Sequence, residues 1–228
     1  MMFASVLRIR RHGALLCCVT FSLLSVGLTA AGAQEPYQRV AAALASARSG
    51  DLEQLQRALK DGASINTRSR IGDSLLMVAI KSNNTAYALH VLQDGADPEL
   101  ANSAGVTPLM AAAFQGNTAV LDALLKQHVA VDAVDRVHKT AMVYAAGSGH
   151  TEVVRLLLDA GISVNARYDA KLTALMWAAG MGHVDTVRLL LQRGADPSLS
   201  DDRGKTAMEM AREAGHAQVA AMLGMHNG

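Results

Sequence analysis

The chain has 228 residues, half of them hydrophobic but only 4% aromatic, with 21 basic and 20 acidic side chains. This low aromatic content, in a chain rich in Ala and Leu, favours closely packed helices over a β-sandwich. Three of the basic residues and none of the acidic ones lie in residues 1–33, so the remainder has a net charge of −2. That balance, without a dense basic stripe, argues against nucleic acid as a partner.

Residues 1–33 have the three parts of a secretory signal peptide. Three arginines lie within the first eleven residues, an uncharged run follows over 14–33, and the small residues Ala31 and Ala33 come directly before Gln34. Cleavage is therefore expected between Ala33 and Gln34, which predicts a periplasmic or secreted bacterial protein. Because about 20 uncharged residues can also span a bilayer, an uncleaved membrane anchor is the alternative.

The rest of the chain repeats with a period of 33 residues, which is typical of a solenoid. A Ser or Thr of one series can cap a helix by accepting a backbone N–H bond. Glycines of two further series can reverse the chain after the first helix and end the second helix. Each period therefore predicts a helix-turn-helix unit. The three series are Ser74, Thr107, Thr140, Thr173 and Thr206; Asn83, Gly116, Gly149, Gly182 and Gly215; and Gly62, Gly95, His128, Gly161 and Gly194.

These residues resemble the ankyrin repeat. The motifs that carry the resemblance are GVTPLMAAAFQGN at 105–117, AAGSGHTEVVRLLLDAGISVNA at 145–166 and GHVDTVRLLLQRGADP at 182–197. The resemblance covers residues 37–224. It implies an all-α solenoid of helix-turn-helix units joined by β-hairpin-like loops.

Four full repeats are expected over residues 69–201, between two degenerate repeats that cap the ends. The full repeats are placed at about 69–101, 102–134, 135–167 and 168–200. The N-terminal capping repeat is 34–68, and the C-terminal capping repeat with its tail is 202–228. The last unit carries Glu209, Arg212, Glu213 and Gln218 where inner units have apolar or small residues, as a terminal repeat with one solvent face requires.

Histidines are the obvious candidates for chemistry, but their spacing argues for a structural role. His150, His183 and His216 are one period apart and are expected to bond backbone groups near the turns rather than to bind metal. Cys17 and Cys18 lie in the signal segment, so the mature chain has no cysteine to complete a zinc site. No nucleophile or phosphate-binding motif is present. We therefore expect no enzyme activity, no cofactor and no metal.

The resemblance places partner contacts at the hairpin tips and on the exposed side of the first helices. Phe114 and Met181 are the favoured binding residues, because they are apolar where the repeat does not demand it. Tyr144 and Trp177, one period apart, fit either inter-repeat core or a binding anchor. The full candidate set is Arg70, Ile71, Asp73, Lys81, Val106, Phe114, Gln115, Arg136, Val137, Lys139, Asp169, Leu172, Met181 and Arg203.

The sequence thus favours an exported, non-catalytic ankyrin-repeat scaffold. It is expected to be a monomer that binds another protein through its concave face. A more specific version is an accessory or protective factor for another exported protein such as an enzyme. The alternative is an effector or immunity protein that acts on a target protein from another cell.

Overall fold

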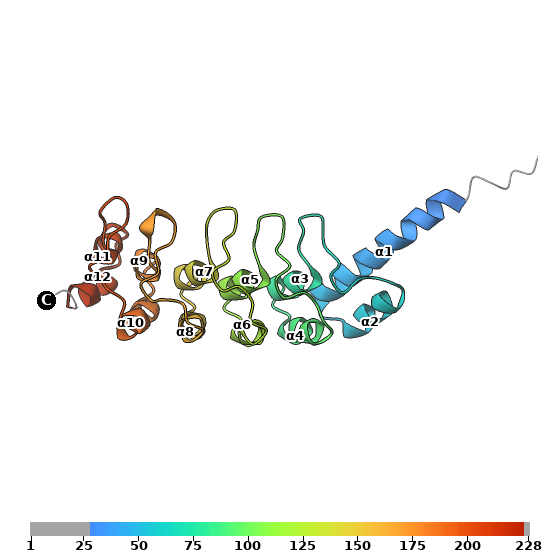
Figure 1. Cartoon of the computed structure of the whole chain (residues 1–228), viewed down its shortest axis with the longest axis horizontal. Helices are drawn as coiled ribbons and strands as arrows, with labels where there is room; N and C mark the ends of the chain where they lie inside the picture. The colour runs from blue at the N-terminus through green and yellow to red at the C-terminus, as the bar shows by residue number, and fades with distance from the viewer. Residues whose placement is uncertain (1–27, 226–228) are drawn as a thin grey trace, which may run out of the picture.

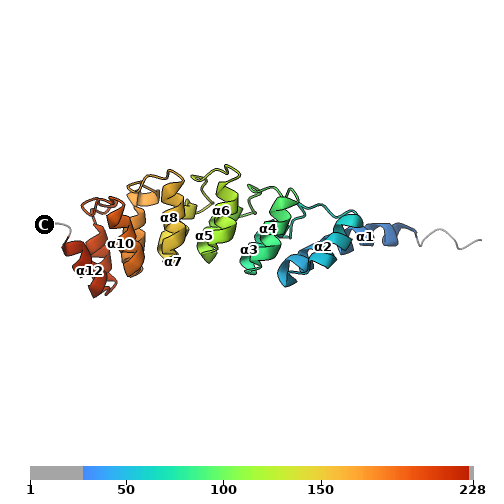
Figure 2. The ribbon, with the colours of Figure 1, turned by 90° about the horizontal axis from the view of Figure 1, so that it is seen from below.

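The computed structural model describes residues 28–225, with side chains described from Tyr37 onward, as a stack of helix pairs (Figures 1 and 2). The stack begins with α1 (Leu28–Ser49) and α2 (Leu52–Lys60). The all-α repeat fold predicted from the sequence is confirmed. The later pairs follow at the 33-residue period: α3 (Leu75–Lys81) and α4 (Thr85–Gln93), α5 (Pro108–Gln115) and α6 (Thr118–Leu125), α7 (Ala141–Ser148) and α8 (Thr151–Asp159), α9 (Ala174–Gly180) and α10 (Val184–Gln192), α11 (Ala207–Glu213) and α12 (Ala217–Gly224).

The first helix of every later pair begins after a Ser or Thr cap. Each capping residue has an extended backbone, and its side-chain oxygen accepts a bond from the N–H three residues on. A cap of this kind contributes about 1 kcal/mol, because it satisfies a backbone donor that the helix leaves unpaired. The predicted series of caps is confirmed at Ser74, Thr107, Thr140, Thr173 and Thr206.

Left-handed residues end the helices, as the glycine series predicted. Gly116 closes α5 with a φ of 71° and Gly149 closes α7 with a φ of 74°. Asn83 and His128 adopt the same region without being glycine, with φ of 57° and 56°. Asn tolerates this conformation better than most residues, whereas His128 holds it at a cost of about 1 kcal/mol.

The helices form two layers (Figure 1). First helices α3, α5, α7, α9 and α11 pack side by side, and second helices α4, α6, α8, α10 and α12 form the layer below them. Side chains from both layers, such as Met110, Leu121 and Leu157, are fully buried between them. Alanine pairs such as Ala145 and Ala146 are also buried, which keeps the first helices thin and lets neighbouring units approach closely.

The two ends of the stack are built differently. At the N-terminus α1 packs on α2 and α3, and its part nearest the chain start projects beyond them (Figure 1). At the C-terminus the four polar residues expected on the last unit are all exposed, which leaves one face of that unit polar, as a cap requires. They are Glu209, Arg212, Glu213 and Gln218.

The predicted signal segment is only partly within the described residues. Residues 1–27 lie outside them, and the predicted cleavage position between Ala33 and Gln34 falls in α1, ahead of the first buried side chain, Ala43. Over residues 28–225, no helix is both long enough and apolar enough to cross a bilayer.

A hairpin-like loop precedes each first helix from α3 onward. In each loop the N–H of one residue donates to the carbonyl oxygen four residues on, at 2.8–3.0 Å. β-Bridges close the first and last loops, Arg68 with Ser74 and Ser200 with Thr206. Backbone bonds also join neighbouring loops, for example from Arg136 N–H to the Ala104 carbonyl oxygen at 3.0 Å. The loops stand in a row along one edge of the stack (Figure 1), and such bonds join the first loop to the second, the second to the third and the fourth to the fifth.

Candidate functional site

The hairpins rise from the layer of first helices (Figure 1). Side chains of some hairpins contact side chains of the first helix that follows. We call these facing side chains of hairpins and first helices the concave surface. The Tyr144 hydroxyl of α7 donates to the Asp135 carboxylate at 2.5 Å, and the Lys205 ammonium pairs with Glu213 of α11 at 2.5 Å. Each hairpin with such a contact is held at a defined angle to its helix.

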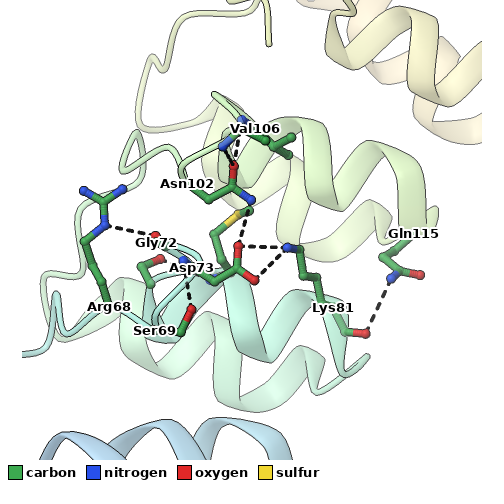
Figure 3. A network of polar contacts seen from close by, with 11 residues as sticks. Arg68, Ser69, Gly72, Asp73, Lys81, Asn102, Val106 and Gln115 are labelled. Atoms are coloured by element: carbon green, nitrogen blue, oxygen red, sulfur yellow. Dashed lines mark hydrogen bonds and ion pairs between the residues drawn. The ribbon is translucent and has the colours of Figure 1, made fainter. Parts of the chain in front are cut away.

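The first hairpin shows how far such a contact can withdraw a residue from solvent (Figure 3). Asp73 was predicted as a tip residue, but the structure buries it. Its carboxylate accepts two bonds from the Lys81 ammonium, at 2.7 and 2.8 Å, and a third from the Asn102 side-chain amide at 2.8 Å. A buried carboxylate is stable only when it is paired in this way. Asp73 and Lys81 are therefore engaged within the chain.

Most of the other candidate residues are on the surface. Lys139 is half-buried, while Val106 and Leu172 pack partly against the core, so these two present less apolar area than their tip positions suggested. Arg203 is exposed but pairs with the buried Asp201 at 2.8 Å. The candidates with exposed side chains are Arg70, Ile71, Lys81, Phe114, Gln115, Arg136, Val137, Asp169, Met181 and Arg203.

A row of rings crosses the middle of the concave surface. Phe114 and Tyr144 meet edge to face, with centroids 5.8 Å apart. The Lys139 ammonium lies 5.6 Å from the centroid of Tyr144 and 5.2 Å from that of Trp177. Tyr144 and Trp177 are half-buried, so each ring packs on the repeats at one side and is accessible at the other. The two rings therefore belong partly to the core between repeats, and their role as binding anchors stays a prediction.

Two glycines of the first helices lie against large side chains of the following repeat. A Cβ atom added at Gly147 would lie 3.7 Å from the Trp177 ring, and one added at Gly180 would lie 3.9 Å from Cβ of Met210. The large side chain of each following repeat therefore covers the glycine of the repeat before it. Sequence reasoning missed the role of Gly147, although the glycines recur one period apart and could have been noticed.

The hydrogen bond between Tyr144 and Asp135, which joins the third hairpin to α7, affects the pKa of both groups. Burial raises the pKa of Tyr144 to about 12, and the hydrogen bond to Asp135 acts in the same direction. Burial alone would raise the pKa of Asp135, but bonds from the Tyr144 hydroxyl and from the N–H groups of Lys139 and Val137 lower it on balance. At neutral pH the pair is therefore a neutral phenol donating to a charged carboxylate.

Periodic histidines form hydrogen bonds between successive repeats. The Nε2–H of His150 donates to the Phe114 carbonyl oxygen at 2.9 Å, and that of His183 donates to the Gly147 carbonyl oxygen at 3.0 Å. In the earlier repeat Asn84 takes this position, and its side-chain amide donates to the Ala47 and Arg48 carbonyl oxygens of α1. The predicted backbone bonding is confirmed for His150 and His183, and these side chains are committed to structure.

Among the side chains of residues 37–225 no three His, Cys, Asp or Glu come together as metal ligands would. The accessible groups of the concave surface are instead apolar and aromatic side chains, with cations among them. Such a surface is suited to contact with another macromolecule.

Comparison with known families agrees with this architecture. The family model for ankyrin repeats, which contains three copies, matches residues 40–135, 76–168 and 166–228. Because these matches together span nearly all of the chain after residue 39, the chain belongs to the ankyrin-repeat family. The resemblance seen in the motifs is thus confirmed. Ankyrin-repeat proteins are scaffolds for protein–protein interaction and typically have no catalytic activity. The comparison with curated proteins found no match.

Proposed function

We propose that this ankyrin-repeat chain is an exported scaffold that binds one protein partner through its concave surface. Three of its hairpins are bonded to their helices by side chains, and backbone bonds join several neighbouring hairpins, so much of the surface is formed before a partner arrives. Binding to such a preorganised surface costs little ordering entropy. The chain acts by recognition, with no chemistry of its own.

The exposure of Phe114 carries this proposal. Its side chain is 54% exposed on α5, and Met181, one of the residues flanking the same row of rings, is 52% exposed. Neither exposure stabilises the fold, because the apolar area stays in water. Aromatic residues and Met are enriched at the centres of protein interfaces, where they are desolvated by the partner.

Export is the second part of the proposal, and the N-terminal residues support it. The cleavage position between Ala33 and Gln34 precedes Val40, Ala42 and Ala43, the first described side chains that pack in or against the core. A chain with a recognition surface of this kind would serve outside the cytoplasm as an accessory or protective factor for another exported protein.

The binding surface is tested by isolating the partner with the tagged chain and then measuring affinity with purified proteins. The double variant Phe114→Ser/Met181→Ser should weaken binding by about 30-fold or more, the effect of losing one interface hot spot. Val134→Ser is the matched control, because Val134 is 56% exposed but is not one of the candidate binding residues. Equal affinity for the double variant and the native chain would exclude this surface.

Export is tested separately by N-terminal sequencing of the chain recovered from outside the cytoplasm. The expected first residue is Gln34. Recovery of a membrane-bound chain that retains residues 14–33 would show an anchor in place of a signal peptide.

A further inference from the structure

One pair of positions in the repeat joins a hairpin to its first helix by an ion pair. The hairpin residue just before the helix cap pairs with the residue eight positions later, in the last turn of the helix. In the first full repeat Asp73 pairs with Lys81 at 2.7 Å, and in the last unit Lys205 pairs with Glu213 at 2.5 Å. At both ends of the array the charge on the hairpin is therefore neutralised within the chain.

The central repeat has the hairpin charge without its partner. Lys139 occupies the hairpin position, but the residue eight positions later is Gly147, which has no side chain. Within the described part of the chain no carboxylate comes within ion-pair distance of Lys139. Asp135 influences it electrostatically but already accepts bonds from the Tyr144 hydroxyl and from backbone N–H groups. Asp169, the exposed acid of the next hairpin, forms no ion pair with it either.

The surroundings hold this ammonium in a defined place. The centroids of the Tyr144 and Trp177 rings both lie within the range of cation–π attraction. A half-buried ammonium that lacks a carboxylate gains more from one than an exposed lysine does, because the partly excluded solvent screens the attraction less. The neighbouring Arg136 is exposed and makes no ion pair among the described residues, so this hairpin carries two cations without an ion-pair partner there.

We infer that the partner presents an acidic and apolar segment to this centre, with an Asp or Glu carboxylate on Lys139 beside Gly147 and a large apolar side chain on Phe114 or Met181. The inference rests on the proposed function and adds the chemistry of the partner. The partner's carboxylate would neutralise the hairpin charge of the central repeat. In the end repeats the chain does this itself, with Lys81 for Asp73 and Glu213 for Lys205.

The test is selection of peptides from a phage-displayed library of random dodecapeptides on the full-length chain, at about 0.15 M salt so that charges a repeat apart are screened. Enriched peptides should combine Asp or Glu with Leu, Phe or Trp. Their affinity should fall at least about tenfold in Lys139→Gln, the usual effect of losing a charge-assisted bond.

Gly147→Glu is an independent variant, because it supplies the missing carboxylate from the chain itself. It should weaken the same peptides to a similar degree, since Lys139 would then be paired as Lys205 is. Gly180→Glu is the matched control: it places a carboxylate at the same helix position one repeat on, where the hairpin residue is Leu172. The control should bind the peptides as the native chain does.

Other outcomes overturn the inference in distinguishable ways. Neutral or basic peptides that are weakened by Phe114→Ser but not by Lys139→Gln would contradict the acidic partner while supporting the concave surface as the binding site. Peptides that bind every variant equally would contradict both proposals. Absence of any enriched peptide would also count against the acidic segment.

Discussion

Tyrosines of the repeat differ in how their hydroxyl groups are satisfied. Tyr144 donates to Asp135, and the Tyr87 hydroxyl lies 2.7 Å from that of Ser46 in α1. The Tyr168 hydroxyl is buried beside Thr140, yet it makes no hydrogen bond of good geometry among the described residues. An unsatisfied buried hydroxyl costs free energy without fixing a contact. Tyr168 is therefore the residue at which a conservative change should be least harmful.

Tyr168 also predicts a pH dependence of stability. Burial raises its pKa to about 12 from the ordinary value of 10. Above pH 10 the unfolded chain loses this proton before the folded chain does, so the free energy of unfolding should fall as pH rises from 10 through 12. In this range one such tyrosine lowers the free energy of unfolding by about 1.4 kcal/mol per pH unit. Below pH 10 its stabilising contribution is fully present.

Urea unfolding of Tyr168→Phe at pH 7, 10 and 11.5 measures this contribution. The variant should be as stable as the native chain at pH 7 and should lose less stability at pH 11.5. Tyr37→Phe, at an exposed site in α1, is the control and should keep the native slope. An identical slope in Tyr168→Phe would show that this hydroxyl does not carry the effect.

At the scale of elements, the turns at Gly116, Gly149 and Gly182 are packed against the histidine of the next unit. A Cβ atom at Gly149 would lie 2.5 Å from Nδ1 of His183, and the same clash recurs between Gly116 and His150. The turn glycine is thus needed twice, for its positive φ and for the space that the imidazole occupies. This contact holds α7 against α9 and α10.

Two alanine substitutions separate these requirements. Gly161 ends α8 with a φ of 97°, and nothing lies within 4 Å of an added Cβ, so Gly161→Ala should cost only backbone strain, about 1 kcal/mol. Gly149→Ala should cost at least about 1 kcal/mol more, because the ring must move and its bond to the Gly147 carbonyl oxygen is lost. Urea unfolding of both variants measures the difference. Equal losses would mean that the histidine does not couple the repeats.

For the whole molecule, α1 supplies the N-terminal cover of the stack. Its own side chains Ala43, Leu44 and Ala47 are buried in the core, and the side chains of Tyr87 and Asn84 form hydrogen bonds to it. Solenoid stability is close to a sum of units and their interfaces, so an end without its cover exposes the interface beneath.

Two truncations test this. A chain beginning at Gln34 should unfold with the free energy of the full-length chain, since every described side chain of the core follows this position. A chain beginning at Leu52 should lose more than about 3 kcal/mol, from apolar burial and from the polar groups left without partners. Thermal and urea unfolding provide the measurement. A large loss in the Gln34 chain would show that residues 1–33 belong to the folded unit.

The sequence by itself determined the repeat and its local devices. These devices depend only on neighbours within one period or the next, so a regular spacing predicts them directly. They are the caps at Thr140 and Thr173, the left-handed turn at Gly149 and the hydrogen bond of His183. The sequence also pointed to Phe114 and Met181 as exposed, because apolar residues there interrupt a pattern that does not need them.

Only the tertiary structure decided which surface charges are free. Asp73 and Lys139 stand at the same position of the repeat, yet one is buried in an ion pair and the other lies unpaired near two rings. The physical reason is that the hairpin residue can pair only with the side chain at the end of the following first helix. That residue is Lys81 in one repeat and Gly147, which has no side chain, in the other. That pairing depends on packing in three dimensions, and it places the accessible positive charge at the centre of the concave surface.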